Sequence, residues 1–313
     1  MYSTINDQLH IINQISTFIN KNPGLELDTS YNYCMNVMKE NSKSFYFATQ
    51  SLLQEKRKGV GALYAFCRLV DDIVDESGKR NEDINYILDH MRDTIINLAQ
   101  GETSDNAILH AFGDTMIKYN IPIVYIHDLI EGVRMDLTKK EYHTNQELEL
   151  YCYRVASTVG LMMVHIFMPN PSPSVLARAS DLGLAMQLTN ILRDVKEDFV
   201  KGRIYVPLET RKLYGVTKES IEMGIVDANF QKLIEYEIER TKSIYKIAEL
   251  GIKELPKQAR YTILLASRVY GDILNQIKRN NYQILNQRAV VSKKRKLFIA
   301  LKLKLGLKFR SLL

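Results

Sequence analysis

The amino-acid sequence predicts an all-α protein. Its 313 residues are 46% hydrophobic and 25% charged, an ordinary globular composition that is long enough to enclose a substantial core. Only 15 glycines and 7 prolines interrupt the chain. Between these breaks, apolar residues recur at helical spacing. We therefore expect one large helical domain.

The predicted helices follow one another with short breaks. The first, within residues 1–22, ends at Asn22-Pro23-Gly24, and a second begins at Thr29. The clearest loop is PNPSPS at 169–174, which has three prolines in five residues. Further helices are predicted at 55–76, 82–100, 105–120, 122–138, 146–168, 175–198, 227–253 and 256–280.

Two of these helices carry acidic residues at matching spacing. Asp71 and Asp75 lie four residues apart in one helix, and Asp194 and Asp198 do so in the other. Residues four apart on a helix differ by about 40° in direction, so each pair points one way. Nearly all their other residues are apolar, which is typical of buried helices. The same two faces also carry Tyr64, Arg68, Gln187 and Asn190.

Carboxylates that share a buried face repel one another and lose hydration, so we expect a cation among them. Carboxylate oxygens suit Mg²⁺, which keeps several waters and also binds substrate phosphates. A single DxxxD is usually a solvated helix face, but two copies in apolar helices favour a metal site. Two such helices facing each other would hold a diphosphate through bridging ions. The candidate ligands of Mg²⁺, or of Mn²⁺ as a substitute, are Asp71, Asp72, Asp75, Asn190, Asp194 and Asp198.

These motifs resemble the squalene and phytoene synthase family, the head-to-head prenyl synthases. The likeness covers roughly residues 31–296 and includes SKSFYFAT, ALYAFCRLVDDIVDE, YCYRVASTVGLMM and LGLAMQLTNILRDVKEDFVKGRIYVP. It implies a single-domain isoprenoid synthase helical bundle with a central apolar cavity. It also implies a prenyltransferase that condenses two allylic diphosphates, and we favour geranylgeranyl diphosphate as substrate and phytoene as product, in carotenoid biosynthesis.

The resemblance also implies roles for individual residues. Asn41 departs from the family, which often has histidine there, and Asp136 matches an acidic position near the family's metals. A helix-end aspartate is also commonly just solvated, so both readings of Asp136 stay open. Besides the four aspartates of the two pairs, the reacting centre would include Tyr64, Arg68, Tyr151 and Tyr270. Substrate-binding roles fall on Ser42, Lys43, Ser44, Gln187, Asn190, Arg193, Arg203, Tyr205 and Arg288. For Ser42, Lys43 and Ser44, a helix cap beside a surface lysine is the alternative.

Several alternatives stay open. Condensation of two farnesyl diphosphates would give dehydrosqualene, presqualene diphosphate or squalene. We expect no NADPH requirement, because no GxGxxG motif follows a strand. A head-to-tail prenyl synthase or a terpene cyclase would typically carry DDxxD or an NSE-type triad instead of two DxxxD motifs. A catalytically silent relative would have lost aspartates that this chain retains.

The cysteines and the apolar runs bear on location. Cys34, Cys67 and Cys152 form no CxxC or Cys/His pattern, which argues against a disulfide framework and a zinc site and favours a reduced, cytoplasmic protein. Cys67 and Cys152 fall in apolar helices, where a small buried side chain is the expected role. We expect no transmembrane helix, because no apolar run approaches 18 residues.

The net charge of +6 is concentrated near the end of the chain. Eight Lys or Arg and no acid lie within 293–313, which leaves 34 basic and 36 acidic residues elsewhere. We expect this segment to bind an anionic membrane peripherally, and we expect no nucleic-acid partner. Its LKLKLGLKF run alternates with period 2, so a helix would not separate its faces well, and a solubilising disordered end is the alternative.

We accordingly divide the chain into an N-terminal extension at 1–30, a prenyl synthase domain at 31–290 and a basic-hydrophobic tail at 291–313. The oligomeric state is left open.

Overall fold

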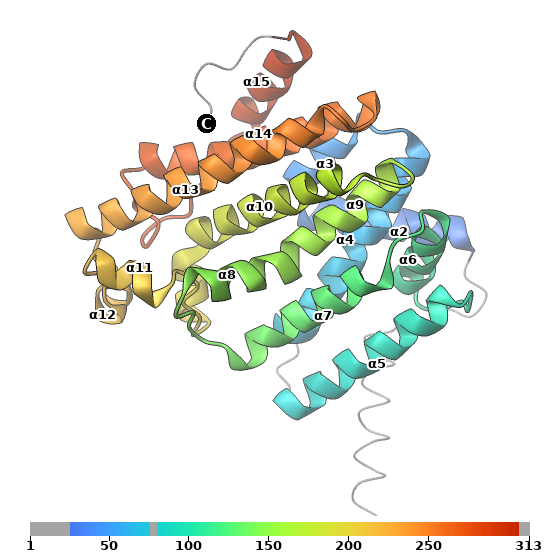
Figure 1. The fold of residues 1–313 in the computed structure, drawn as a ribbon, viewed down its shortest axis with the longest axis horizontal. Coiled ribbons are helices and arrows are strands. Elements are labelled where there is room, and N and C mark those ends of the chain that lie inside the picture. Colours follow the sequence, from blue (N-terminus) through green and yellow to red (C-terminus); the bar gives the residue numbers. More distant parts are fainter. Residues whose placement is uncertain (1–25, 76–79, 307–313) are drawn as a thin grey trace, which may run out of the picture.

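The computed structural model describes residues 26–75 and 80–306, and within them the protein is all-α. Figure 1 shows long helices that run side by side. The elements are α2 (Leu27–Asn41), α3 (Lys43–Thr49), α4 (Gln54–Asp75), α5 (Asn81–Ala99), α6 (Ala107–Lys118), α7 (Ile123–Thr138), α8 (Asn145–Cys152), the π-helical turn η1 (Tyr153–Ser157), α9 (Thr158–Phe167), α10 (Pro173–Val200), α11 (Leu208–Leu213), α12 (Lys218–Glu222), α13 (Ala228–Ile252), α14 (Lys257–Arg279) and α15 (Lys293–Lys304).

The long helix α10 runs through the middle of the bundle (Figure 1). It begins where the sequence predicts, after the proline-rich loop, because Pro173 needs no hydrogen-bond acceptor at the first turn and the Ser172 hydroxyl accepts the N–H of Val175. It contacts α8, η1, α9, α13 and α14. Helices that precede α10 in sequence and helices that follow it are therefore arranged around it.

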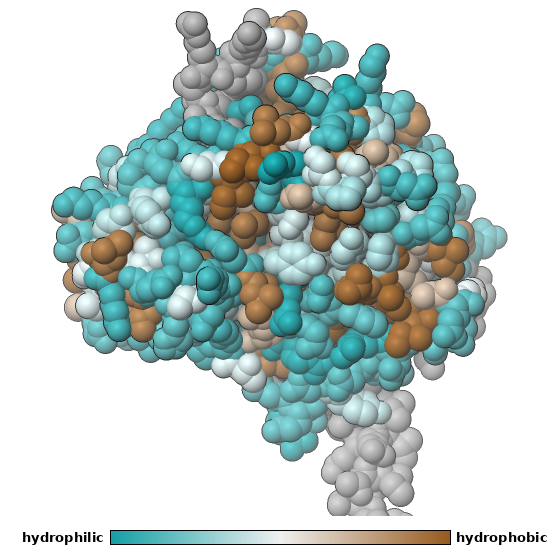
Figure 2. All heavy atoms as spheres, viewed as in Figure 1, coloured by the Kyte–Doolittle hydropathy of each residue, from teal (hydrophilic) through white to brown (hydrophobic). Residues whose placement is uncertain are grey.

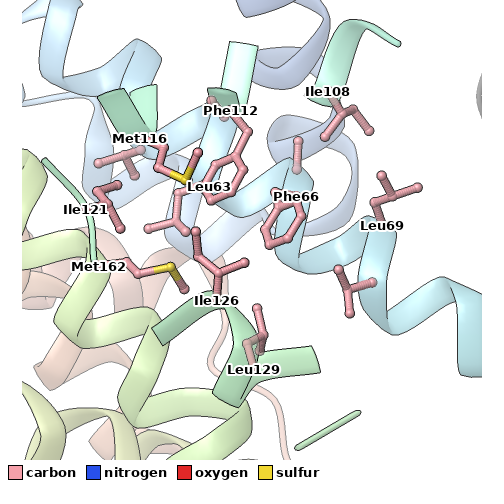
Figure 3. Packing of buried hydrophobic residues seen from close by; sticks show 14 of the residues in the cluster. Leu63, Phe66, Leu69, Ile108, Phe112, Met116, Ile121, Ile126, Leu129 and Met162 are labelled. Carbon is pink, nitrogen blue, oxygen red and sulfur yellow. The ribbon is translucent and has the colours of Figure 1, made fainter. Parts of the chain in front are cut away.

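The buried residues form two large clusters on either side of α10. The first fills the space between α2, α4, α5, α6, α7 and α9, and its centre is the stacked pair Phe66 and Phe112, whose ring centroids are 4.1 Å apart (Figure 3). The second lies between α8, α10, α13 and α14. Leu182 and Val155 pack against both clusters, so the middle of α10 and the turn η1 join the two halves of the core.

The helix predicted at 146–168 is interrupted by the π turn η1. Two neighbouring helices approach this turn very closely, each at a glycine. A Cβ on Gly132 of α7 would lie 2.6 Å from Cβ of Arg154, and a Cβ on Gly183 of α10 would lie 2.5 Å from the carbonyl oxygen of Ala156. The turn is thus wedged between α7 and α10 at distances that only glycine allows.

Gly160 of α9 packs closely against α10 and also borders open space. A Cβ there would lie 2.7 Å from the carbonyl oxygen of Ala179, and the residue also lines a cavity described below.

Gly183→Ala is expected to lower the free energy of unfolding by about 1–3 kcal/mol, because its methyl group would press on backbone atoms that cannot rotate away. Chemical denaturation monitored by circular dichroism measures this change. Gly113→Ala in α6 is the matched control, since the three atoms nearest to its new Cβ all belong to the side chain of Leu98, the closest at 3.1 Å. Equal stability losses in the two variants would contradict the backbone-contact explanation.

The ends of the domain differ from the predicted division. Helix α2 begins at Leu27, so the boundary placed after residue 30 falls inside a helix. The helix predicted within 1–22 lies outside the described residues. At the other end, α15 packs on α14, so the described part of the tail is an element of the bundle. The short helices α3, α11 and α12 have no counterpart among the predicted elements.

Only one stretch of the described chain is long and apolar enough for a membrane span by length and composition, residues 145–167. It comprises α8, η1 and α9, which pack against α4, α7 and α10. Its apolar character is accounted for by this central position.

Candidate active site

Two adjoining pockets lie beside α10. One is an apolar cavity of about 290 Å³, walled by α3, α4, η1, α9, α10, α13 and α14. The other is a polar pocket of about 360 Å³, at the C-terminal ends of α4 and α10. Asp71, Val155, Gln187 and Asn190 line both. The two spaces therefore adjoin at these four residues, with charged groups lining one and mainly hydrocarbon side chains lining the other.

The structure brings the two acidic motifs together. Asp71 and Asp75 of α4 line the polar pocket opposite Asp194 and Asp198 of α10. Asp72, which the sequence also puts forward as a metal ligand, is not among the lining residues and lies 2.5 Å from the guanidinium of Arg68. Its direction follows from its position one residue after Asp71, about 100° around the helix.

Two of these carboxyl groups hold their protons unusually strongly. Asp71 opens onto the pocket, but the surrounding protein removes much of its hydration, and this effect raises its pKa to about 7, with a further contribution from Asp75. Burial likewise raises the pKa of Asp198 to about 7, helped by the charge of Asp194. In the metal-free protein, the surrounding groups therefore do not fully stabilise the ionised forms of Asp71 and Asp198.

The other two aspartates already have cationic partners. Asp75 accepts hydrogen bonds from Lys201 at 2.7 Å and from Arg203 at 3.0 Å. Burial opposes its ionisation, but these two bonds outweigh burial and hold the pKa of Asp75 below its usual value. Asp194 accepts both hydrogen bonds of Arg193, at 2.8 and 2.5 Å, and one from Arg288 at 2.9 Å. The cations that could grip a diphosphate therefore line the pocket.

Asp136, whose role the sequence leaves open, is buried in the wall of the polar pocket. Its carboxylate accepts hydrogen bonds from the hydroxyls of Tyr151 at 3.0 Å and Tyr205 at 2.8 Å, and the Arg203 guanidinium lies 4.0 Å away. The hydroxyl oxygens of Tyr151 and Tyr205 lie 3.2 Å apart. These contacts fix the two tyrosines, and they exclude the solvated reading of Asp136.

The donor set fits a divalent cation. The buried carbonyl oxygen of the Asn190 side chain has no hydrogen-bond donor in the described part of the chain, while its amide donates to Gln187 at 3.2 Å. No three Asp, Glu, His or Cys side chains converge within the described residues to chelate one ion. Each ion would therefore take one or two carboxylates and fill its remaining positions with water and phosphate oxygens, as Mg²⁺ usually does.

Two of the three candidate tyrosines lie in the wall of the apolar cavity, and the third, Tyr151, lies in the wall of the polar pocket. Tyr64 and Tyr270 line the apolar cavity, and Phe45 stacks on Tyr64 with ring centroids 5.9 Å apart. Burial raises the pKa of Tyr64 to about 12, so its hydroxyl stays neutral. Cys67, expected to be buried, is a half-buried free thiol that lines the same cavity, and the loss of hydration there raises its pKa. Cys152 is buried as expected.

The SKS segment, like Asp72, lies outside the lining of both pockets. Ser42, Lys43 and Ser44 lie at the start of α3 and line neither pocket. Ser42 lies beside the Tyr64 hydroxyl, whereas Lys43 lies close to Lys296 of α15. Conversely, Glu197 and Lys201 line the polar pocket although sequence reasoning did not select them, and only their place beside Asp198 could have suggested them.

Comparison with known proteins agrees with this geometry. The family model described as squalene/phytoene synthase matches residues 38–295. Phytoene synthase of Arthrospira platensis is 36% identical over 274 residues, which are 84% of this chain and 88% of the relative. The 15-cis-phytoene synthase of Synechocystis sp. is 35% identical over 88% of this chain and 84% of the relative. A crystal structure of a dehydrosqualene synthase with ligand superposes with a TM-score of 0.84 at 29% identity, covering 91% of this chain and 99% of that one.

The match extends across nearly all the elements that build the two pockets, and the described fold is the all-α isoprenoid synthase fold of these relatives. Such enzymes act on prenyl diphosphates and typically need a divalent metal. The chain belongs to the squalene/phytoene synthase family and is a prenyltransferase.

Proposed function

We propose that this enzyme joins two molecules of geranylgeranyl diphosphate head to head and releases phytoene. The observation that carries this proposal is that the polar pocket and the apolar cavity adjoin and share Asp71, Val155, Gln187 and Asn190 as lining residues. An allylic diphosphate has the same two parts in the same order. Eight relatives named as phytoene synthases, each 34–39% identical, support the C20 substrate.

The polar pocket would hold the diphosphate groups. Asp71, Asp75, Asp194 and Asp198 would hold Mg²⁺, with Mn²⁺ able to replace it, and Asn190 would add its free carbonyl oxygen. When bound, such an ion neutralises charge on the departing diphosphate. Charge-assisted hydrogen bonds to the phosphate oxygens would come from four cations of the pocket wall, Arg193, Lys201, Arg203 and Arg288.

The apolar cavity would hold the prenyl chains and exclude water from the carbocation formed when a carbon–oxygen bond breaks. The faces of Tyr64 and Tyr270 can stabilise that cation by about 2 kcal/mol in a dry site. Across the condensation and the rearrangement of its cyclopropyl intermediate, two diphosphates and two protons leave. Released diphosphate is the proton acceptor, and no reductant enters, so we propose that NADPH is not required.

Product analysis tests this function. Purified enzyme with Mg²⁺ and no nicotinamide should convert geranylgeranyl diphosphate to a C40 hydrocarbon that co-elutes with phytoene, and it should convert farnesyl diphosphate much more slowly. The Asp71→Asn enzyme is the negative control. Turnover of farnesyl diphosphate alone would move the assignment to C30 synthesis, and a product that forms only with NADPH would indicate squalene.

We also propose that the enzyme works in the cytoplasm at the surface of a membrane. Both its substrate and its hydrocarbon product would be lipids, and residues 293–313 carry eight cations and no acid.

A further inference from the structure

Helix α15 is apolar on two opposite sides. Ile299 on one side is fully buried against Ala48 of α3 and against Leu265, Ala266 and Val269 of α14. On the other side Leu297, Phe298, Leu301 and Leu305 are 43–61% exposed. A helix with one apolar face buries it against its own protein, so a second apolar face needs a second partner. This arrangement also explains why the sequence shows no separation into one apolar and one polar face.

Polar contacts on the inward side of α15, the side that carries Ile299, fix the orientation of the helix. They therefore also fix the direction of its outward face, which carries Leu297, Phe298, Leu301 and Leu305. Asp272 of α14 is completely buried, and both its oxygens accept hydrogen bonds from the Arg295 guanidinium at 3.0 and 2.9 Å. Ser292 caps the first turn by accepting the N–H of Arg295, and Tyr261 donates to the carbonyl oxygen of Ala300 at 3.3 Å. Because a buried carboxylate needs its cation, α15 is held on the bundle in one orientation.

The exposed apolar side chains are surrounded by positive charge. The sequence contains no Asp or Glu after Asp272. Lys293, Lys294 and Lys304 form no ion pair within the described residues. Burial and the nearby charges of Lys293 and Lys43 lower the pKa of Lys296, as expected in a cluster of like charges. Asp272, the carboxylate that contacts α15, is buried and already paired with Arg295. In the space-filling view, hydrophobic and hydrophilic residues lie side by side at the edge where α15 lies (Figure 2).

We propose that α15, together with Lys43, is a docking surface for an anionic lipid bilayer. Leu297, Phe298, Leu301 and Leu305 would enter the boundary between headgroups and acyl chains, and the lysines would meet the acidic headgroups. Charge complementarity selects an acidic membrane over a neutral one. This inference rests on the proposed function for the need to meet lipid, but its surface and partner are argued from α15 alone.

Docking in this way would place the apolar cavity next to the membrane. Ala266 and Met186 line the cavity and also belong to the cluster on which Ile299 packs. The space for the prenyl chains is thus one helix layer away from the surface that would touch the bilayer.

Tryptophan probes give a direct test, because the chain has no tryptophan. Phe298→Trp places a single fluorophore on the outward face, and Leu213→Trp on α11 is the matched control at another exposed apolar position, 75% accessible. With vesicles containing phosphatidylglycerol, the emission of the Phe298→Trp variant should shift to the blue and be quenched by brominated lipid. The emission of the control variant should not change. Equal behaviour of the two probes would overturn the proposal.

A second pair of variants tests the surface without a probe. Leu297→Glu combined with Leu301→Glu should weaken co-sedimentation with phosphatidylglycerol vesicles at least tenfold, whereas Leu213→Glu should not. Both variants change only exposed side chains, so their circular dichroism and their activity on detergent-dispersed substrate should match the parent enzyme. Truncation after Arg288 is a poorer test, because it would leave Asp272 without its cation and expose Ala48 and Val269.

The outcomes separate this inference from the proposed reaction. If the parent enzyme makes C40 product in detergent but does not bind anionic vesicles, the docking surface is ruled out and the proposed reaction is supported. Vesicle binding by an enzyme that makes no C40 product in detergent would do the reverse. Equal binding by the parent and the Leu297→Glu, Leu301→Glu variant would also rule out the docking surface.

Discussion

Asp71→Asn is expected to lower kcat by roughly 100-fold to 1,000-fold or more, the range seen when one group that stabilises developing charge is removed. Asp71 lies at the junction of the polar pocket and the apolar cavity, where the diphosphate would meet its prenyl chain. A neutral amide cannot balance a divalent ion there. Steady-state release of diphosphate from geranylgeranyl diphosphate measures the loss. Asp194→Asn should cause a loss of similar size.

The two variants should differ in stability. Asp71→Asn removes a charge that burial and Asp75 disfavour, so the metal-free protein should be at least as stable as the parent. Asp194→Asn leaves the largely enclosed Arg193 without its carboxylate, at a cost of roughly 1–3 kcal/mol. From the sequence alone, relief of repulsion would be expected in both cases. The ion pairs with Arg193 and Arg288 are the reason for the difference.

Two further substitutions test whether the loss of activity is specific to the aspartates that line the polar pocket. Asp72→Asn should reduce turnover less than Asp71→Asn, because Asp72 pairs with Arg68 outside the pocket lining. Asp93→Asn, on the exposed surface of α5, should leave both activity and stability unchanged. Near-normal turnover by Asp71→Asn at saturating Mg²⁺ would show that the metal-clamp assignment is wrong.

Removal of divalent metal is expected to abolish turnover, and added Mg²⁺ or Mn²⁺ should restore it. Without the ion, the charge on the leaving diphosphate would be met by side chains that are already paired with Asp75 and Asp194. The experiment treats the enzyme with EDTA, desalts it and titrates each metal while product is measured. Full activity of the desalted enzyme in chelator would contradict the proposal.

Metal affinity should also depend on pH. Since the pKa values of Asp71 and Asp198 are raised to about 7 in the metal-free protein, binding below pH 7 must displace protons. Isothermal titration with Mg²⁺ should therefore show affinity falling between pH 8 and pH 6, by up to about tenfold per pH unit for each proton displaced. The pH dependence should be weaker in Asp71→Asn. Equal affinity across this range would contradict the raised pKa values.

The same shifts set the sign of the stability change. Between about pH 4 and pH 7, the folded protein keeps protons on Asp71 and Asp198 that the unfolded chain has already released. Their contribution to the free energy of unfolding therefore falls as pH rises through this range. Chemical denaturation of the metal-free protein at several pH values between 4 and 7 measures this change in the free energy of unfolding.

The long helices and the acidic faces could be predicted because both follow from local spacing. The repeat of four that aligns Asp71 with Asp75 needs no knowledge of the rest of the chain. The contact of Asp75 with Lys201 could not be predicted, since 126 residues separate the two and only the packing of α4 against the turn after α10 brings them together. Asp136 could not be assigned for a similar reason, because its partners Tyr151 and Tyr205 lie on other elements.

The tail and the SKS segment show a different reason why the structure could not be predicted from the sequence. Period-2 alternation in the tail argues against a helix with one apolar face, yet α15 is helical because α3 and α14 cover one of its two apolar sides. Lys43 is adjacent in sequence to two serines that resemble a phosphate grip, but α3 turns it toward Lys296. Sequence spacing gives the direction of a side chain on its own helix, whereas the surroundings depend on tertiary packing.

The π turn η1 has a consequence for the chain's tolerance of insertions and deletions. A π turn is equivalent to one extra residue within an α-helix, so removing one residue between Tyr153 and Ser157 would leave a regular helix. That change would rotate α9 relative to α8 by about 100°. Gly160 would then turn away from Ala179, and the side chains of α9 that wall the cavity would face the core instead. A single-codon deletion here would therefore be far more damaging than one in the proline-rich loop before α10.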